Sequence, residues 1–329
     1  MSLLMDTGSA TLWVFDTTCR SISCIGVPGS GFTRRRFNTR SSSTFARQRR
    51  SIDLQYGAGR CSGPIGRDVV SFAGNDLDIL HHLNEIKMCG YNNIGTYYLS
   101  ATIENQEFVS VTEADNSFFY MPIDGILGLG RPAIAVGGVN FRYCKKQDEF
   151  IFQLRNENRS TAVKTAGLIT FGAINAINCQ SQINYVPLSN EKHWQFAIEG
   201  FSIGRFSQIK REEVVSDTGT SWIGAPTEIV EAVVKPNRCT LRLTEQVLHH
   251  QLFNNEDPAR LVVHYQLRKI QYTTRGIRAR YWYWRRTKIP SGSMTMDWIL
   301  GEAWIRTYCN IYDFGQNRIG FAKAIHSEI

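Results

Sequence analysis

The chain has 329 residues, enough for two domains of ordinary size, and its 43% hydrophobic content supports a core in each. No run of 18 or more apolar residues occurs, so we predict no transmembrane helix. The formal net charge is +8, but nine basic and no acidic residues lie between Pro258 and Met296, and without them the net charge is −1. The basicity is therefore local, and we expect no nucleic-acid partner.

The cysteine and histidine spacings predict no metal site. Neither C-x-x-C nor H-E-x-x-H occurs in the sequence. The Gly-x-Gly at Gly57–Gly59 lacks the helix start of a dinucleotide site, so we expect no cofactor. Eight cysteines favour an oxidising compartment over the cytosol, and the glycosylation acceptor Asn158–Ser160 agrees with that interpretation.

The first predicted elements surround Asp6. Residues 3–15 read as an apolar run, Asp-Thr-Gly-Ser and a second apolar run, which is typical of a strand, a tight loop and a strand. Taken alone, one Asp-Thr-Gly is better explained as a turn closed by a hydrogen bond of the Asp side chain. Residues 33–50 are polar and basic and predict a solvated loop. Residues 51–72 then predict a hairpin with a Gly-rich tip that could act as a hinge.

The rest of the chain repeats this organisation. The Asp-Thr-Gly motif returns at Asp217, which lies 211 residues after Asp6 and again follows a predicted strand. A short helix is predicted from Pro226 to Val234 because proline favours a first helical turn. Each half also contains an Ile-Leu-Gly element, and glycines in such strands suit a crowded interior. The remaining strands are predicted within residues 121–130, 167–172, 185–188, 194–198, 201–204, 214–216, 298–301 and 309–322.

Taken together, these motifs resemble the pepsin-like aspartic proteases. The matching segments span nearly the whole chain in the order of that family: Asp6–Ser9 with Leu12–Val14, Tyr56–Gly59, Asp124–Gly130, Asp217–Ser221 and Trp298–Gly301. The resemblance implies a mostly β, bilobal fold with a central cleft. We expect an N-terminal lobe at residues 1–165 and a C-terminal lobe at residues 166–329, each contributing one aspartate.

The resemblance also implies roles for individual residues. Asp6 and Asp217 would share one proton, because two carboxylates a few ångströms apart do not both ionise easily. Together they would activate a water molecule for peptide hydrolysis. Cys19 and Cys24 would close a small disulfide loop. Supporting residues around the two aspartates would be Thr7, Gly8, Ser9, Thr218, Gly219 and Thr220. Tyr56, Gly57 and Ala58 would form a flap over the cleft, with the Tyr56 hydroxyl directed at Trp13. Apolar walls of the substrate pockets would be Leu4, Ile123 and Ile126.

Three stretches depart from the family pattern. Only five residues precede Asp6, so we expect the first family strands to be missing and the product to be poorly soluble or unstable. Residues 80–101 fit no family element and predict either a loop insertion or an error of the gene model. Residues 258–296 predict a variable surface hairpin or such an error rather than a functional basic patch.

The favoured function is an endopeptidase that acts at acidic pH between hydrophobic residues. We expect a monomer with peptide or protein substrates, located outside the cell or in lysosomes or endosomes. One alternative is a pepsin-like protein that binds peptides without cleaving them. Another is a protein that binds an anionic surface through the Arg-rich block. A serine or cysteine protease is disfavoured because Ser221 lacks the G-x-S-x-G turn and no Cys and His form an evident pair.

Overall fold

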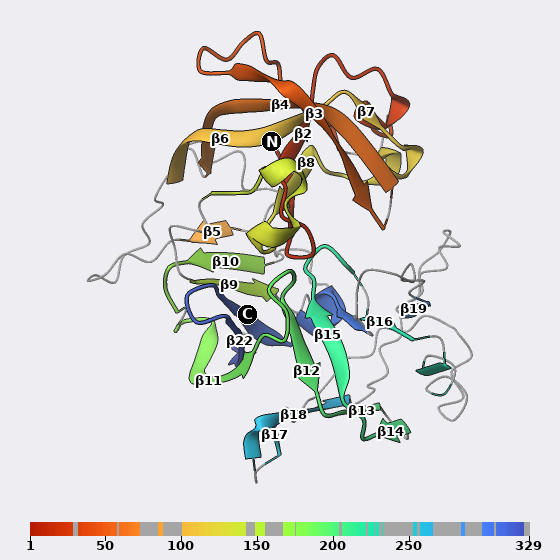
Figure 1. Ribbon diagram of the computed structural model, residues 1–329, viewed down its shortest axis with the longest axis vertical. Coiled ribbons are helices and arrows are strands. Elements are labelled where there is room, and N and C mark those ends of the chain that lie inside the picture. Colours follow the sequence, from red (N-terminus) through yellow and green to blue (C-terminus); the bar gives the residue numbers. More distant parts are fainter. Residues whose placement is uncertain are drawn as a thin grey trace. The chain divides into compact units, whose positions relative to one another are not determined.

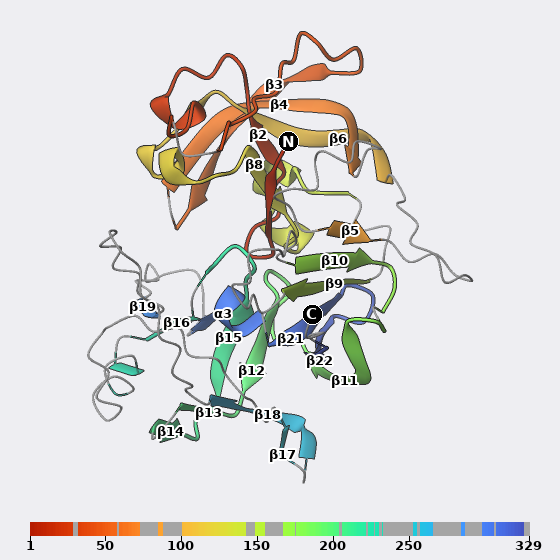
Figure 2. The ribbon, with the colours of Figure 1, turned by 180° about the vertical axis from the view of Figure 1, so that it is seen from behind.

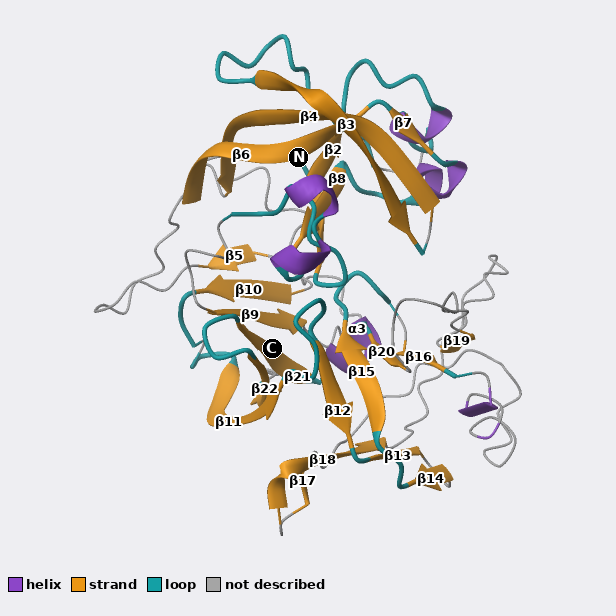
Figure 3. Ribbon diagram, in the orientation of Figure 1, coloured by secondary structure: helices purple, strands orange, loops and turns teal. Residues whose placement is uncertain are grey.

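The computed structural model is mostly β, which confirms the predicted fold class (Figure 3). Two compact units can be distinguished: unit 1 is Met1–Phe150 with Arg159–Ala173, and unit 2 is Ile151–Asn158 with Ile174–Ile329. The structure describes residues 1–28, 32–57, 59–72, 85–87, 101–142, 149–154, 167–174, 176–203, 206–221, 223–226, 228–229, 232, 253–254, 257–265, 284–286, 298–305 and 307–325. No helix in these ranges has the length and hydropathy that a membrane span requires.

Unit 1 is built on a seven-stranded sheet with the order β1-β8-β2-β6-β4-β3, in which β7 also pairs with β4 (Figure 1). Its strands are β1 (Leu3–Asp6), β2 (Trp13–Phe15), β3 (Ala46–Tyr56), β4 (Gly59–Phe72), β6 (Ala101–Val111), β7 (Glu113–Ala114) and β8 (Gly125–Gly128). Strand β5 (Glu85–Lys87) runs parallel to β10 (Gly167–Phe171) at the end of another sheet. The short 3-10 helices are η1 (Ile22–Cys24), η3 (Asn116–Tyr120), η4 (Pro132–Ile134) and η5 (Val136–Gly138).

The glycines of β8 permit an unusually close approach of backbones, as the sequence predicted. A Cβ built on Gly125 would lie 2.1 Å from the carbonyl oxygen of Trp13, and one on Gly128 would lie 2.3 Å from the amide nitrogen of Thr11. Both contacts are far shorter than a Cβ tolerates, so only glycine fits between the neighbouring strands. Strand β1, which carries Asp6, and strand β2, which follows it, both pair with β8.

The prediction of a solvated loop for residues 33–50 is wrong at both ends. Strand β3 begins at Ala46, and Arg34 is buried. The Arg34 guanidinium donates to the carbonyl oxygens of Ser23, Phe118 and Met121 and lies 4.6 Å from the centre of the Phe15 ring. Hydrogen bonds from the two terminal guanidinium nitrogens and the face of an aromatic ring stabilise this buried cation. Sequence pattern alone could not distinguish this arginine from its exposed neighbours.

Unit 2 contains two further sheets and the neighbouring strands β11-β22-β21-β9, in that order (Figure 2). The two sheets have the orders β12-β15-β20-β16-β19 and β14-β13-β18-β17. The strands are β9 (Glu149–Leu154), β11 (Cys179–Pro187), β12 (Gln195–Ile198), β13 (Gly200–Ile203), β14 (Phe206–Gln208), β15 (Glu212–Ser216), β16 (Ile223–Ala225), β17 (Phe253–Asn254), β18 (Asp257–Tyr265), β19 (Trp284–Arg286), β20 (Trp298–Leu300), β21 (Tyr308–Asp313) and β22 (Arg318–Ala324). The α-helix α3 (Glu302–Ile305) follows β20 directly.

The predicted C-terminal hairpin is present as β21 and β22, paired from Tyr308 with Lys323 to Asp313 with Arg318. At the predicted helix after Pro226, the described residues Glu228, Ile229 and Ala232 are helical. Of residues 80–101, the short strand β5 and Ala101 are described, and of residues 258–296 the backbone of β18 and β19 is described. The rest of both stretches, Ala58 and the acceptor Asn158–Ser160 lie outside the described residues.

The two units contain the same four-strand arrangement with the same register. In unit 1, β1 runs parallel to β8 with Leu4 opposite Ile126, and β2 runs antiparallel to β8 with Trp13 opposite Ile126. In unit 2, β15 runs parallel to β20 with Val215 opposite Ile299, and β16 runs antiparallel to β20 with Gly224 opposite Ile299. A parallel neighbour completes each set, β6 beside β2 and β19 beside β16. The two halves of the chain therefore repeat in structure as well as in sequence motifs.

Candidate active site

Asp6 ends strand β1, and its carboxylate is held by the loop that follows. The amide of Gly8 donates to Oδ1 at 2.9 Å, and the hydroxyl of Ser9 donates to Oδ2 at 2.5 Å. Asp6 is buried, and the neighbouring Thr7 is fully buried. Hydrogen bonds to both oxygens fix the orientation of the carboxylate.

Asp217 is held in the same way at the end of β15. The amide of Gly219 donates to Oδ1 at 2.8 Å, and the hydroxyl of Thr220 donates to Oδ2 at 2.5 Å. Thr218, like Thr7, is buried. Each unit thus presents one aspartate with one amide and one hydroxyl in equivalent positions, and this equivalence disfavours the simple turn interpretation of either motif.

A hydrogen-bonded chain of side chains connects the β3–β4 hairpin to the Asp6 loop within unit 1. The indole Nε1 of Trp13 donates to the hydroxyl of Tyr56 at 2.9 Å. Burial raises the pKa of Tyr56, as do the nearby Cys61 and Asp6, whereas hydrogen bonds with the side chains of Trp13 and Ser9 act in the opposite direction. The Tyr56 hydroxyl therefore remains protonated at neutral and acidic pH. Its position links the hairpin to the carboxylate through Ser9.

The predicted pocket residues pack around this chain. Ile123 and Ile126 are buried in the unit 1 core with Trp13, and Leu4 and Tyr56 lie against the same cluster. Gly57 is exposed at the tip of the hairpin, where an added Cβ would meet no atom within 4 Å.

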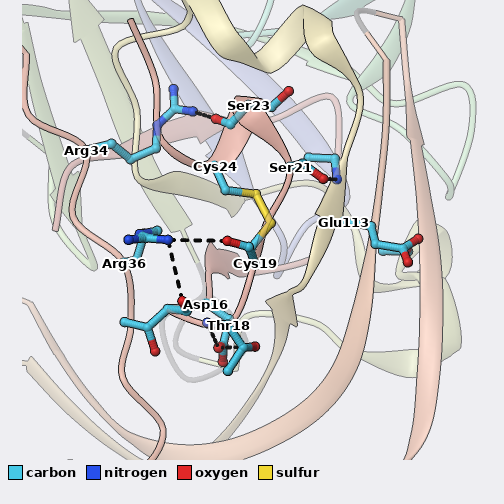
Figure 4. Close-up of a disulfide and its surroundings, with 12 residues drawn as sticks. Asp16, Thr18, Cys19, Ser21, Ser23, Cys24, Arg34, Arg36 and Glu113 are labelled. Carbon is cyan, nitrogen blue, oxygen red and sulfur yellow. Dashed lines mark hydrogen bonds between the residues drawn. A yellow bond between two sulfur atoms is a disulfide. The ribbon is translucent and has the colours of Figure 1, made fainter. Parts of the chain in front are cut away.

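Two disulfides are present in the described part of the chain. Cys19 is bonded to Cys24, as the family resemblance implied. Arg34 and Arg36 both bind backbone carbonyls of this loop, at Ser23 and Cys19 (Figure 4). The second disulfide, Cys179 to Cys309, was not predicted, because sequence gives no means of pairing widely separated cysteines.

A family model described as eukaryotic aspartyl protease matches residues 1–87 and 85–324. The chain belongs to this family. Among its relatives, aspartic protease 1 of Caenorhabditis elegans is 35% identical over 341 residues, which cover 99% of this chain and 79% of that protein. Aspartic protease 17 of the same organism is 32% identical, covering 99% of this chain and 80% of that protein. Gastricsin of Callithrix jacchus is 28% identical, covering 98% and 77%.

Membership in the aspartyl protease family agrees with the paired Asp loops and the Tyr56 hairpin. In the described ranges, no group of three or more His, Cys, Asp or Glu side chains is arranged to hold a metal ion. The sequence interpretation missed His193, which lies beside the Asp217 loop. Its position could have been found by treating the predicted strands at 194–198 and 214–216 as antiparallel neighbours.

Proposed function

We propose that this aspartyl protease family member is an active aspartic endopeptidase, with Asp6 and Asp217 as its catalytic dyad. The observation that supports the proposal best is the duplicated loop, in which each carboxylate accepts one amide and one hydroxyl hydrogen bond. Two independent turns would not be expected to share strand register, hydrogen-bond set and sequence. Under this proposal, residues 1–165 and 166–329 act as the two lobes.

In the proposed reaction, the dyad holds one proton. The ionised aspartate removes a proton from a water molecule, which attacks the scissile carbonyl carbon. The protonated aspartate donates a hydrogen bond to the carbonyl oxygen and then helps to protonate the leaving amine. The Gly8 and Gly219 amides and the Ser9 and Thr220 hydroxyls hold the carboxylates in place throughout.

The proposed substrate is an extended peptide bound through its main chain, with apolar side chains flanking the cleaved bond. Tyr56 and Gly57 would cover it from the hairpin, Trp13 would orient Tyr56, and Leu4, Ile123 and Ile126 would contribute apolar surface. We propose that the enzyme acts as a monomer. The two disulfides support an extracellular, lysosomal or endosomal location, because disulfides persist in oxidising compartments.

The test is cleavage of a fluorogenic peptide with hydrophobic residues at the central bond, measured near pH 4. We expect turnover by the natural sequence and a loss of at least about 1,000-fold in kcat for Asp6→Asn and for Asp217→Asn, because each substitution removes an acid–base group. The control is Asp53→Asn, which removes only an exposed ion pair with Arg60 and should leave kcat unchanged.

Binding of a statine-type inhibitor to the natural sequence, without any cleavage, would replace the proposal by the peptide-binding alternative. Equal turnover by the natural sequence and Asp217→Asn would place the chemistry elsewhere.

A further inference from the structure

The backbone brings His193 close to Asp217. Strands β12 and β15 are antiparallel, with Gln195 opposite Val215. The amide of Ser216 donates to the carbonyl oxygen of Trp194 at 3.1 Å, which continues the same register by one residue. The next pair in that register is His193 with Asp217.

The hydrogen bond between Ser216 and Trp194 holds the two chains together directly beside His193 and Asp217. His193 precedes Trp194 on one chain, and Asp217 follows Ser216 on the other, so the two residues leave this bonded position on the same side of an antiparallel pair. The charge of the Asp217 carboxylate acts on the imidazole from this neighbouring position.

His193 is also sheltered from water, with a relative exposure of 7%. Burial lowers the pKa of His193, and the neighbouring Lys192 acts in the same direction, while the Asp217 carboxylate raises the pKa. Lys192 is exposed. Further along the face of His193, Gln195 donates to Glu213 at 3.1 Å. Asp217 is thus the acidic group opposite the imidazole in the paired strands.

We propose that His193 is a positioning residue that extends the activity of the enzyme to more acidic pH by placing an imidazolium beside the Asp217 carboxylate. The inference rests on the proposed function, since it assumes that Asp217 belongs to the dyad. As pH falls, His193 takes up a proton, and its positive charge favours the ionised form of Asp217. The dyad then retains its single negative charge at a lower pH than it would beside a neutral side chain.

The first experiment is the pH dependence of kcat/KM for the natural sequence and for His193→Gln. An opposite charge within about 4–6 Å shifts a titration by roughly one to three pH units. We therefore expect the midpoint of the acidic limb to rise by about one pH unit in His193→Gln, with kcat/KM at the optimum changed less than about threefold. The matched control, Lys192→Gln, removes an adjacent exposed charge and should leave the midpoint in place.

The second experiment measures the coupling without turnover. The imidazole of His193 is titrated by NMR after sequential assignment of the backbone and side-chain resonances of the natural sequence. Because Asp217 raises the pKa of His193, Asp217→Asn should lower that pKa. This measurement requires a folded protein but no activity, and it also covers the case in which His193→Gln fails to fold.

The outcomes separate this inference from the proposed function. An unchanged His193 pKa in Asp217→Asn overturns the inference, whether or not the enzyme cleaves peptides. An active enzyme whose acidic limb is the same in His193→Gln also overturns it and leaves the proposed function intact. A uniform loss of activity at every pH in His193→Gln would show a packing role instead. Absence of cleavage by the natural sequence overturns the proposed function and, with it, the catalytic role of His193.

Discussion

Removal of the Cys179–Cys309 disulfide should destabilise unit 2 far more than removal of Cys19–Cys24 destabilises unit 1. The first bond joins the start of β11 to β21 across a sequence separation of 130 residues, and the second closes a separation of five. All four sulfur-bearing side chains are buried. Replacing either pair by alanine therefore leaves a comparable cavity, and the main difference between the two variants is the length of the loop released in the unfolded chain.

The magnitude follows from the chain entropy of loop closure. At 25 °C this entropy amounts to about 5 kcal/mol for the longer loop and about 2 kcal/mol for the shorter one. The double variant Cys179→Ala with Cys309→Ala should thus lose about 3 kcal/mol more unfolding free energy than Cys19→Ala with Cys24→Ala. A loss of about 5 kcal/mol is comparable to the whole stability of many domains.

The assay is urea unfolding followed by tryptophan fluorescence. Trp194, Trp298 and Trp304 are buried reporters in unit 2, and Trp13 is the buried reporter in unit 1. Replacing Trp13 by Phe in a parallel set of variants assigns the transitions to the units. Equal destabilisation by the two double variants, or a larger effect from the Cys19–Cys24 pair, would refute the loop-length reasoning.

Three further predictions concern unit 1. Gly128→Ala should lower the unfolding free energy by about 1–3 kcal/mol, because the new Cβ meets the Thr11 backbone, whereas Gly57→Ala should be neutral; thermal unfolding of both variants tests this. Tyr56→Phe should cost about 1–3 kcal/mol in urea unfolding, since the fully buried Trp13 loses its acceptor, and a neutral result would show that the indole finds another partner. Burial, followed by the charges of Asp115 and Asp53, raises the pKa of the Cys61 thiol to about 12, so mass spectrometry should find Cys61 unlabelled by iodoacetamide at pH 8 until the protein unfolds. The thiol of the unfolded chain ionises at about pH 8.5. The contribution of protonated Cys61 to the unfolding free energy is therefore complete below that pH and is lost as the pH rises toward 12. Rapid labelling of the native protein would contradict the buried position of Cys61.

The candidate site was largely predictable because its signals are local. Asp6 and Asp217 each follow an apolar run and precede a glycine, and that order of residue types suffices to predict a strand that ends in a tight loop. The glycines of β8 likewise predict a close approach of backbones, even when the partner strand is not known. The Cys19–Cys24 bond spans so few residues that a family resemblance was enough to suggest it.

The features that sequence did not reveal depend on residues brought together from distant positions. Arg34 belongs to a basic, polar segment, and its burial follows only from three carbonyl acceptors and the Phe15 ring. The partner of Cys179 depends on the packing of β11 near β21. His193 becomes relevant only when the β12–β15 register places it across from Asp217.

The sequence by itself determined that two Asp-Thr-Gly loops, two Ile-Leu-Gly strands and a Gly-rich hairpin exist, because strand periodicity and glycine conformations are properties of a few consecutive residues. Only the tertiary structure decided which strands pair, that both units repeat one register, which arginine is buried, and which histidine lies near the Asp217 loop. The burial and hydrogen bonding of a whole sheet determine which strands pair. The entropy cost of closing a long loop between two strands cannot be recognised from a few consecutive residues.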